Sequence, residues 1–205
     1  MTDPFAHDRF VLHQHIRLVI NQYEFSLPGA DGADPGPAFC FVEQKRFKFK
    51  EDIRFFADEG KGTELLRIKA RQRFDPGATY DITAAGAVIG TIRKAFGASL
   101  LRSQFVLTDA STGTEVIARE RSLPVALLRR VIGFVPYVGG FADWLPIPYD
   151  FEFLAADGRR LGENRRRRWR LRDVYDIDLR ADAERELDRR LAVAAAVGMD
   201  ALMAR

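Results

Sequence analysis

The sequence predicts a mainly β fold, in which about twelve antiparallel strands close into a barrel threaded by a C-terminal hydrophobic helix. Three observations predict it: hairpin units that recur along the chain, further alternating apolar segments around them, and an apolar run at the end. The 205 residues, 47% of them hydrophobic, suit one domain with a sizeable core. We therefore treat residues 1–205 as a single domain.

Four segments share one form: an alternating apolar strand, a turn that contains glycine, and a second strand that ends in basic residues. They are residues 53–71 (IRFFADEGKGTELLRIKAR), 80–94 (YDITAAGAVIGTIRK), 105–121 (FVLTDASTGTEVIARER) and 151–168 (FEFLAADGRRLGENRRRR). Each is typical of a β-hairpin, because glycine adopts the positive φ that tight turns require. Their repetition predicts one antiparallel sheet that curls or closes.

Three further segments carry strand patterns. They are residues 15–27 (HIRLVINQYEFSL), 39–50 (FCFVEQKRFKFK) and 174–179 (VYDIDL). In the second of them, Phe47 and Phe49 are expected to face the interior while Lys48 faces outward, because successive side chains of a strand alternate. With the hairpins, these segments bring the expected number of strands to about a dozen.

The C-terminal run predicts a helix over residues 182–204, with Asp182 as N-cap and with Glu184 and Glu186 near its positive end. Apolar side chains follow at helical spacing, at Leu187, Leu191, Ala194, Gly198 and Ala201. Residues 191–199 are apolar on every side, which is typical of a buried helix. They are mostly Ala, Val and Gly, so this slim helix can fill a barrel whose interior is too wide for its own side chains.

The same run is not expected to anchor the chain in a membrane. It is shorter than the roughly 20 apolar residues that a spanning helix needs, and Asp200 interrupts it.

Two segments do not fit a strand pattern. Residues 28–37 (PGADGADPGP) predict a Gly/Pro-rich loop, and residues 123–149 form an apolar insertion in which Pro136 would end a short helix. Aromatic side chains punctuate the insertion, at Phe134, Tyr137, Phe141 and Trp144. Beside Arg129 and Arg130 they suit a segment that contacts a membrane interface. The alternative is that the insertion packs on the outside of the barrel or makes a dimer contact.

A run of arginines ends the last hairpin. It consists of Arg165, Arg166, Arg167 and Arg168, followed after Trp169 by Arg170. Such a run can bind phosphates, either in lipid headgroups or in nucleic acid with Trp169 stacking on a base. The alternative is an exposed hairpin end in which some of the arginines pair with Glu163, Asp173 or Asp176.

Composition and missing motifs narrow the classes of function. The pI is about 9.2 and the net charge is +3, so only local basic patches matter. The single cysteine, Cys40, and an N-terminus without signal-peptide features fit a cytoplasmic protein. No Walker loop, GxGxxG, GxSxG, HExxH or CxxC motif occurs, so an enzyme is the least expected class and no cofactor is implied.

Two pairs of polar residues are candidate sites. His13 and His15 would share one face of a strand, but a third ligand is missing, so no metal site is expected. Asp176 and Asp178 are interpreted as a solvated strand face rather than as an acid–base pair.

The chain resembles the tubby C-terminal superfamily, and within it the LURP-one-related and phospholipid-scramblase-like branches. The resemblance is carried by YDITAAGAVIGTIRKAF (80–96), SQFVLTDASTGTEVIARER (103–121) and the ending DVYDIDLRADAERELDRRLAVAAAVGMDALM (173–203). It implies a twelve-stranded barrel around a central helix, with phosphoinositide headgroups bound by basic strand residues. The chain has no acidic calcium loop and no Cys-rich palmitoylation segment, which argues against ion-triggered lipid scrambling.

The first hypothesis is a non-enzymatic domain that binds anionic phospholipid peripherally at a membrane surface, on the cytoplasmic side. Arg165–Arg168 and Arg170 would contact headgroups, and the insertion would bury Phe141 and Trp144 at the interface. The second is a protein-interaction or structural module in which the insertion forms an oligomer interface. The third and weakest is nucleic-acid binding through the arginine run.

Overall fold

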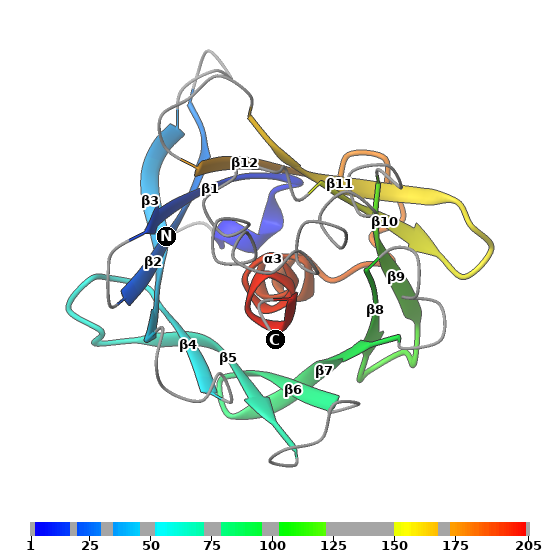
Figure 1. The fold of residues 1–205 in the computed structure, drawn as a ribbon, viewed down its shortest axis with the longest axis horizontal. Coiled ribbons are helices and arrows are strands. Elements are labelled where there is room, and N and C mark those ends of the chain that lie inside the picture. Colours follow the sequence, from blue (N-terminus) through cyan, green and yellow to red (C-terminus); the bar gives the residue numbers. More distant parts are fainter. Residues whose placement is uncertain are drawn as a thin grey trace, which may run out of the picture.

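In the computed structural model, the described residues are 3–16, 20–29, 35–45, 52–71, 79–95, 103–121, 150–167 and 173–203. Within them, twelve antiparallel strands close into a barrel around helix α3 (Figure 1). The strands are β1 (Arg9–Ile16), β2 (Ile20–Pro28), β3 (Pro35–Lys45), β4 (Asp52–Phe56), β5 (Glu64–Ala70), β6 (Thr79–Ala84), β7 (Ala87–Lys94), β8 (Gln104–Asp109), β9 (Glu115–Glu120), β10 (Phe151–Ala155), β11 (Arg160–Arg166) and β12 (Asp173–Asp178). A short 3-10 helix, η1 (Pro4–Ala6), precedes them, and α3 (Arg189–Met203) follows. The predicted fold class is therefore confirmed.

Every strand pairs with its neighbours along the chain, and the first strand pairs with the last. Phe10 of β1 lies opposite Ile177 of β12, and Leu12 lies opposite Tyr175, which closes the sheet. The four predicted hairpins are β4–β5, β6–β7, β8–β9 and β10–β11. A closed meander of this kind leaves no unpaired sheet edge.

The hairpin turns depend on residues with positive φ. Gly86, Gly113 and Gly158 supply it in the last three hairpins, with φ of 80°, 72° and 86°. In β4–β5 the position falls instead on Lys61, at φ 60°, although glycines stand on both sides of it. In β6–β7, Ala85 has a positive φ of 48° beside Gly86, so glycine takes this role alone in only two of the four hairpins.

The barrel interior is apolar because inward positions recur at every second residue. Six phenylalanines are among the fully buried side chains, namely Phe10, Phe25, Phe55, Phe105, Phe151 and Phe153. Cys40 belongs to the same core, and burial raises the pKa of its thiol far above the ordinary value. Cys40 is therefore a small core residue and not a reactive thiol.

Helix α3 lies on the barrel axis, as Figure 1 shows. All side chains from Leu191 to Val197 are buried, together with Met199. The slimness of the helix is needed where it approaches the wall. A methyl group placed on Gly90 of β7 would lie 2.8 Å from Cδ2 of Leu191, and one on Gly198 would lie 3.2 Å from Cδ1 of Ile68. The apolar run thus enters the protein's own core, as the sequence predicted.

The predicted start of this helix at Asp182 is wrong, because α3 begins at Arg189. Arg185 has a φ of 54°, and a left-handed residue cannot continue a right-handed helix. The Asp182 carboxylate instead accepts hydrogen bonds from the backbone N–H groups of Glu186 (2.9 Å) and Leu187 (3.0 Å). Asp188 caps the helix by accepting from the backbone N–H of Arg190 at 2.8 Å. Glu184 and Glu186 therefore lie in the linker before the helix.

A buried guanidinium fixes the position of the helix. Arg189 is 2% exposed, and its guanidinium donates to the carboxylates of Asp8 (2.7 and 2.9 Å) and Asp182 (2.5 Å). It also donates to the backbone carbonyls of Leu187 (2.8 Å), Asp182 (3.0 Å) and Leu179 (3.3 Å). These bonds join the start of β1, the linker after β12 and the first turn of α3.

The predicted loop over residues 28–37 is shorter than expected. Strands β2 and β3 extend into it from both sides, and Pro28 lies opposite Pro35. Proline is tolerated at strand ends, where its missing N–H costs little. Residues 30–34 and the insertion 123–149 lie outside the described residues.

Candidate functional site

Five strands that run in the same direction end in basic residues. In a closed antiparallel barrel every second strand has the same direction, so the C-terminal ends of β3, β5, β7, β9 and β11 meet at one rim. We call this end the basic rim. Its basic residues, at or directly after the strand ends, are Lys45, Lys69, Arg71, Arg93, Lys94, Arg119, Arg121, Arg165, Arg166 and Arg167. The closure of the barrel thus gathers residues that are far apart in the sequence.

The opposite rim, formed by the hairpin turns and the linker to α3, has the reverse character. Among the residues that the structure describes there, acidic residues outnumber basic ones. The acidic residues include Asp8, Asp58, Glu59, Asp109, Glu115, Asp157, Asp178, Asp182, Glu184 and Glu186. The barrel therefore carries an asymmetry of charge along its axis, which orients a protein in front of a charged surface.

The arginines of the run differ in exposure and in their contacts. Arg165 is exposed on the outer face of β11, and no hydrogen bond or ion pair of its guanidinium occurs among the described residues. Arg167 donates to both carboxylate oxygens of Asp176, each at 2.7 Å, which is one of the pairings considered from the sequence. Arg166 is half-buried, and its backbone N–H donates to Asp150 at 2.9 Å. Arg168 and Arg170 lie outside the described residues.

A second group of basic side chains surrounds a shallow cavity of about 500 Å³ on the outer face of β5, β6 and β7. Arg67 binds Asp52 at 2.7 Å and Arg71 binds Asp81 at 2.8 Å, while Lys69 lies between these two arginines on β5. Lys69 and Arg93 are both exposed, and the described part of the chain offers neither of them an ion pair. Lys69, Arg93 and Arg165 are thus three cations of the basic rim that face solvent.

The ion pair between Arg67 and Asp52 affects stability in acid. Hydrogen bonds from Arg67 hold the pKa of the Asp52 carboxyl below its ordinary value. A carboxyl whose pKa is lower in the folded chain stabilises the fold above the unfolded pKa of about 4, and this contribution disappears as the pH falls through the folded pKa.

We expect Asp52→Asn to lower the free energy of unfolding at neutral pH by no more than about 1 kcal/mol, because the pair is partly exposed. The difference from the parent should vanish in strong acid, where the parent carboxyl is also neutral. Urea unfolding at neutral pH and at about pH 2 measures both values. A deficit of equal size at both pH values would contradict the role of the charge.

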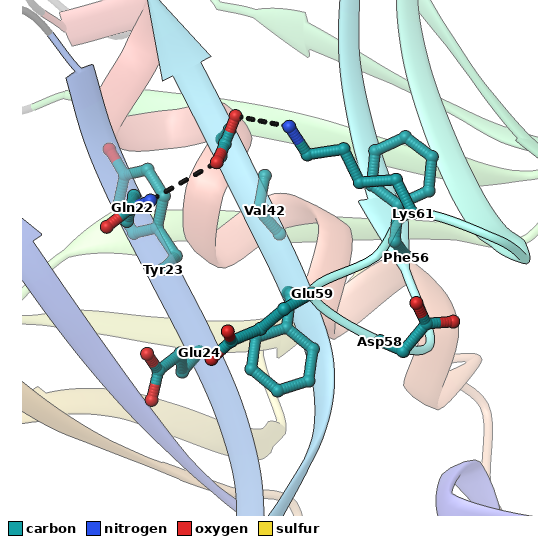
Figure 2. Close-up of a pocket in the computed structure, with 10 residues that line it drawn as sticks. Gln22, Tyr23, Glu24, Val42, Phe56, Asp58, Glu59 and Lys61 are labelled. Atoms are coloured by element: carbon teal, nitrogen blue, oxygen red, sulfur yellow. Dashed lines mark hydrogen bonds and ion pairs between the residues drawn. The ribbon is translucent and has the colours of Figure 1, made fainter.

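A third feature lies on the outer faces of β2 and β3 beneath the β4–β5 hairpin. It is a cavity of about 190 Å³. Lys61 extends from the hairpin (Figure 2), and its Nζ donates to the Glu43 carboxylate at 2.7 Å. The Gln22 side chain donates to the other oxygen of the same carboxylate at 3.2 Å. The remaining charged groups of the lining are Glu24, Asp58 and Glu59, so this cavity is acidic.

This cavity was not expected from the sequence, although the sequence and the strand pairing hold one signal for it. Phe41 and Phe56 lie opposite each other on neighbouring strands, half-buried and outside the core cluster. On the outer face of a barrel strand, a polar residue is the usual choice. Two aromatic residues opposite each other at outward positions are therefore unusual, and they indicate a surface feature. The carboxylates could not have been grouped, because they come from separate segments of the chain.

The pairs His13 with His15 and Asp176 with Asp178 both lie on outer strand faces. The rings of His13 and His15 lie 6.3 Å apart on the outer face of β1, and His15 Nε2 is 3.4 Å from the Glu24 carboxylate. Within the described residues, no group of three His, Cys, Asp or Glu side chains is placed to hold a metal ion. Asp176 pairs with Arg167 and Asp178 pairs with Arg180, as expected for a charged outer strand face.

The aromatic residues of the insertion, Phe134, Tyr137, Phe141 and Trp144, lie outside the described residues. The described residues that flank the insertion are Arg121 and Asp150. The backbone N–H of Arg121, after β9, donates to the carbonyl of Asp150, before β10, at 2.9 Å. The insertion therefore leaves and re-enters the barrel at the basic rim.

Among the described helices, none combines the length and apolar character needed to cross a bilayer. No curated protein and no solved structure matches the chain significantly. The sequence model of the LURP-one-related family matches residues 39–200, which include β4 to β12 and most of α3. The twelve-stranded barrel with its central helix agrees with the tubby-like fold that the resemblance implied. The chain therefore belongs to the LURP-one-related family.

Proposed function

We propose that this protein is a non-enzymatic domain that binds anionic phospholipid with its basic rim, peripherally and on the cytoplasmic side of a membrane. The observation that carries the proposal is the charge asymmetry of the barrel, with Lys69, Arg93 and Arg165 exposed at one rim. Arg121 and Asp150, which flank the apolar insertion, lie at the same rim, so basic and apolar contacts can act together.

The energetics favour a surface made of several cations over a single deep pocket. Each Lys or Arg near an anionic leaflet contributes about 1 kcal/mol, so several are needed for stable binding. A cation that has no fixed carboxylate partner contributes most to the binding free energy, because no existing ion pair has to break before it binds a headgroup. The pairs of Arg67, Arg71 and Arg167 therefore rank below the three exposed cations as expected contacts.

The insertion adds an apolar component in this proposal. Aromatic side chains settle at the headgroup level of a bilayer, and their contribution is insensitive to salt. Phe141 and Trp144 would supply it, with Arg168 and Arg170 extending the basic surface. Electrostatic binding alone would weaken steeply as salt rises.

Co-sedimentation with phosphatidylcholine vesicles, with and without phosphatidylserine, tests the proposal. Two double variants remove the same charge at opposite rims: Arg93→Gln with Arg165→Gln, and Arg159→Gln with Arg180→Gln. We expect binding to anionic vesicles only, weakened roughly tenfold to thirtyfold by the first double variant and hardly changed by the second. Trp144→Ala should remove the part of the binding that persists at moderate salt.

Three outcomes would overturn the proposal. Equal loss in both double variants would mean that only net charge matters. Absence of binding to any vesicle, with a mass in solution that rises with concentration, would favour the insertion as an oligomer interface. Binding to single-stranded nucleic acid with a steep salt dependence, and none to vesicles, would favour the arginine run as a nucleic-acid site.

A further inference from the structure

We infer that the acidic cavity beneath the β4–β5 hairpin is a docking site for a lysine or arginine side chain in a basic segment of a partner protein. The cavity is separate from the basic rim, and it has the opposite charge. The inference rests on three properties of the lining, which are its charge, its aromatic residues and its size.

The charge of the lining selects a cation. Four carboxylates, those of Glu24, Glu43, Asp58 and Glu59, line the cavity together with a single ammonium group, that of Lys61. Asp58 accepts from the backbone N–H of Gly62 within the turn. Glu59 is exposed, and the described residues provide no ion pair for it. An incoming cation can therefore bind the Glu59 carboxylate without breaking an existing ion pair.

The aromatic residues of the lining add cation–π attraction and apolar packing to the electrostatic attraction of the site. Phe41 and Phe56 line the cavity as opposite residues of β3 and β4. A guanidinium or ammonium group over such a ring gains a cation–π attraction, and the methylene groups of a lysine or arginine can pack on it. A hydrated metal ion would not pack against these rings in this way. The combination therefore points to a long basic side chain.

Size distinguishes a side chain from a metabolite. The cavity holds about 190 Å³, below the roughly 300–1,000 Å³ of pockets that enclose small molecules. It opens on the side of the barrel, where the rest of a partner chain can continue across the surface. A single anchoring residue of a peptide or protein fits these limits.

Lys61 is itself a cation bound at this site. Its ammonium donates to Glu43 at 2.7 Å while its backbone occupies the strained position of the turn (Figure 2). It is exposed, so the pair can open at small cost. A partner's basic side chain would compete with Lys61 for Glu43, and this predicts effects of opposite sign for two neighbouring substitutions.

The test uses the full chain and a fluorescein-labelled peptide with three arginines separated by serines. The same peptide with citrulline in place of arginine keeps the shape and loses the charge. Fluorescence anisotropy at low salt measures the affinity. Glu59→Gln should weaken binding about threefold to fivefold, as expected for one exposed charge pair, and Lys61→Gln should strengthen it by a similar factor. Glu115→Gln removes an exposed carboxylate from β9 and should change nothing.

The inference would be overturned if Glu115→Gln weakened binding as much as Glu59→Gln, or if Lys61→Gln left the affinity unchanged. Equal binding of the citrulline peptide would also contradict it. Sedimentation of Glu59→Gln with anionic vesicles separates this site from the proposed lipid surface, because that binding should remain at the parental level whatever the peptide does.

Discussion

Replacing Arg189 by methionine is expected to lower the free energy of unfolding by about 3–5 kcal/mol, the usual cost of removing one partner from a buried ion pair. The carboxylate of Asp182 is fully buried, and in the variant it would lose its counter-charge. The Asp8 carboxylate would lose one of its two arginine partners and keep Arg185, and three backbone carbonyls would each lose one hydrogen bond. A protein of this size has a total stability of about 5–15 kcal/mol, so the loss is a large fraction of it.

The neighbouring Arg190 provides the control for this experiment. It pairs with Asp188, but its side chain is 41% exposed. Arg190→Gln should therefore cost less than about 1 kcal/mol. The double variant Arg189→Met with Asp182→Asn should be less than additive, because the two residues share one network. Urea unfolding followed by circular dichroism measures the parent, the double variant and the three single variants, including Asp182→Asn alone. Equal effects at positions 189 and 190 would refute the role of the buried network.

Gly90→Ala is expected to destabilise the protein by about 3 kcal/mol, the upper part of the range for overpacked cores. The new methyl group would lie 2.5 Å from the backbone carbonyl of Thr108 and 2.8 Å from Leu191 on α3. The side chain of Leu191 can move, but the strand carbonyl cannot move without disturbing the ladder. Adding Leu191→Ala should consequently restore only part of the loss.

The same substitution at Gly198 tests the other side of the helix–wall contact. There the nearest atom is Cδ1 of Ile68, at 3.2 Å, which is the end of a flexible side chain. Alanine also favours the helix over glycine by about 1 kcal/mol. Gly198→Ala should therefore stay within about 1 kcal/mol of the parent. Comparable losses in the two variants, measured by thermal unfolding, would show that the helix does not pass closest to the wall at Gly90.

The sequence predicted those parts of the fold that depend on local patterns. Turn glycines such as Gly86, Gly113 and Gly158 marked three of the hairpins, because a positive φ is a property of single residues. Phe47 and Phe49, which were expected to face the interior, lie outside the described residues. The apolar run after Leu187 indicated the buried helix, because a helix that is apolar on every side is typically buried. The exact start of that helix was missed, since it depends on the left-handed turn at Arg185.

The candidate sites divide in the same way. The basic end of each hairpin is visible in the sequence, and the run Arg165–Arg168 with Arg170 was predicted as a site there. That these ends form one rim follows only from the common direction of β3, β5, β7, β9 and β11 in the closed sheet. The fixed pair of Arg167 with Asp176 distinguishes it from exposed Arg165, and this depends on the register of β11 against β12.

By itself, the sequence determined the strands, the buried helix and the basic hairpin ends, because each follows from the spacing and chemistry of neighbouring residues. Only the tertiary structure decided which distant groups meet. It joined Asp8 to Arg189 across almost the whole chain, and it brought Glu24, Glu43 and Glu59 around one cavity. Such contacts depend on how the sheet closes and on which residues lie opposite each other. No local pattern contains that information.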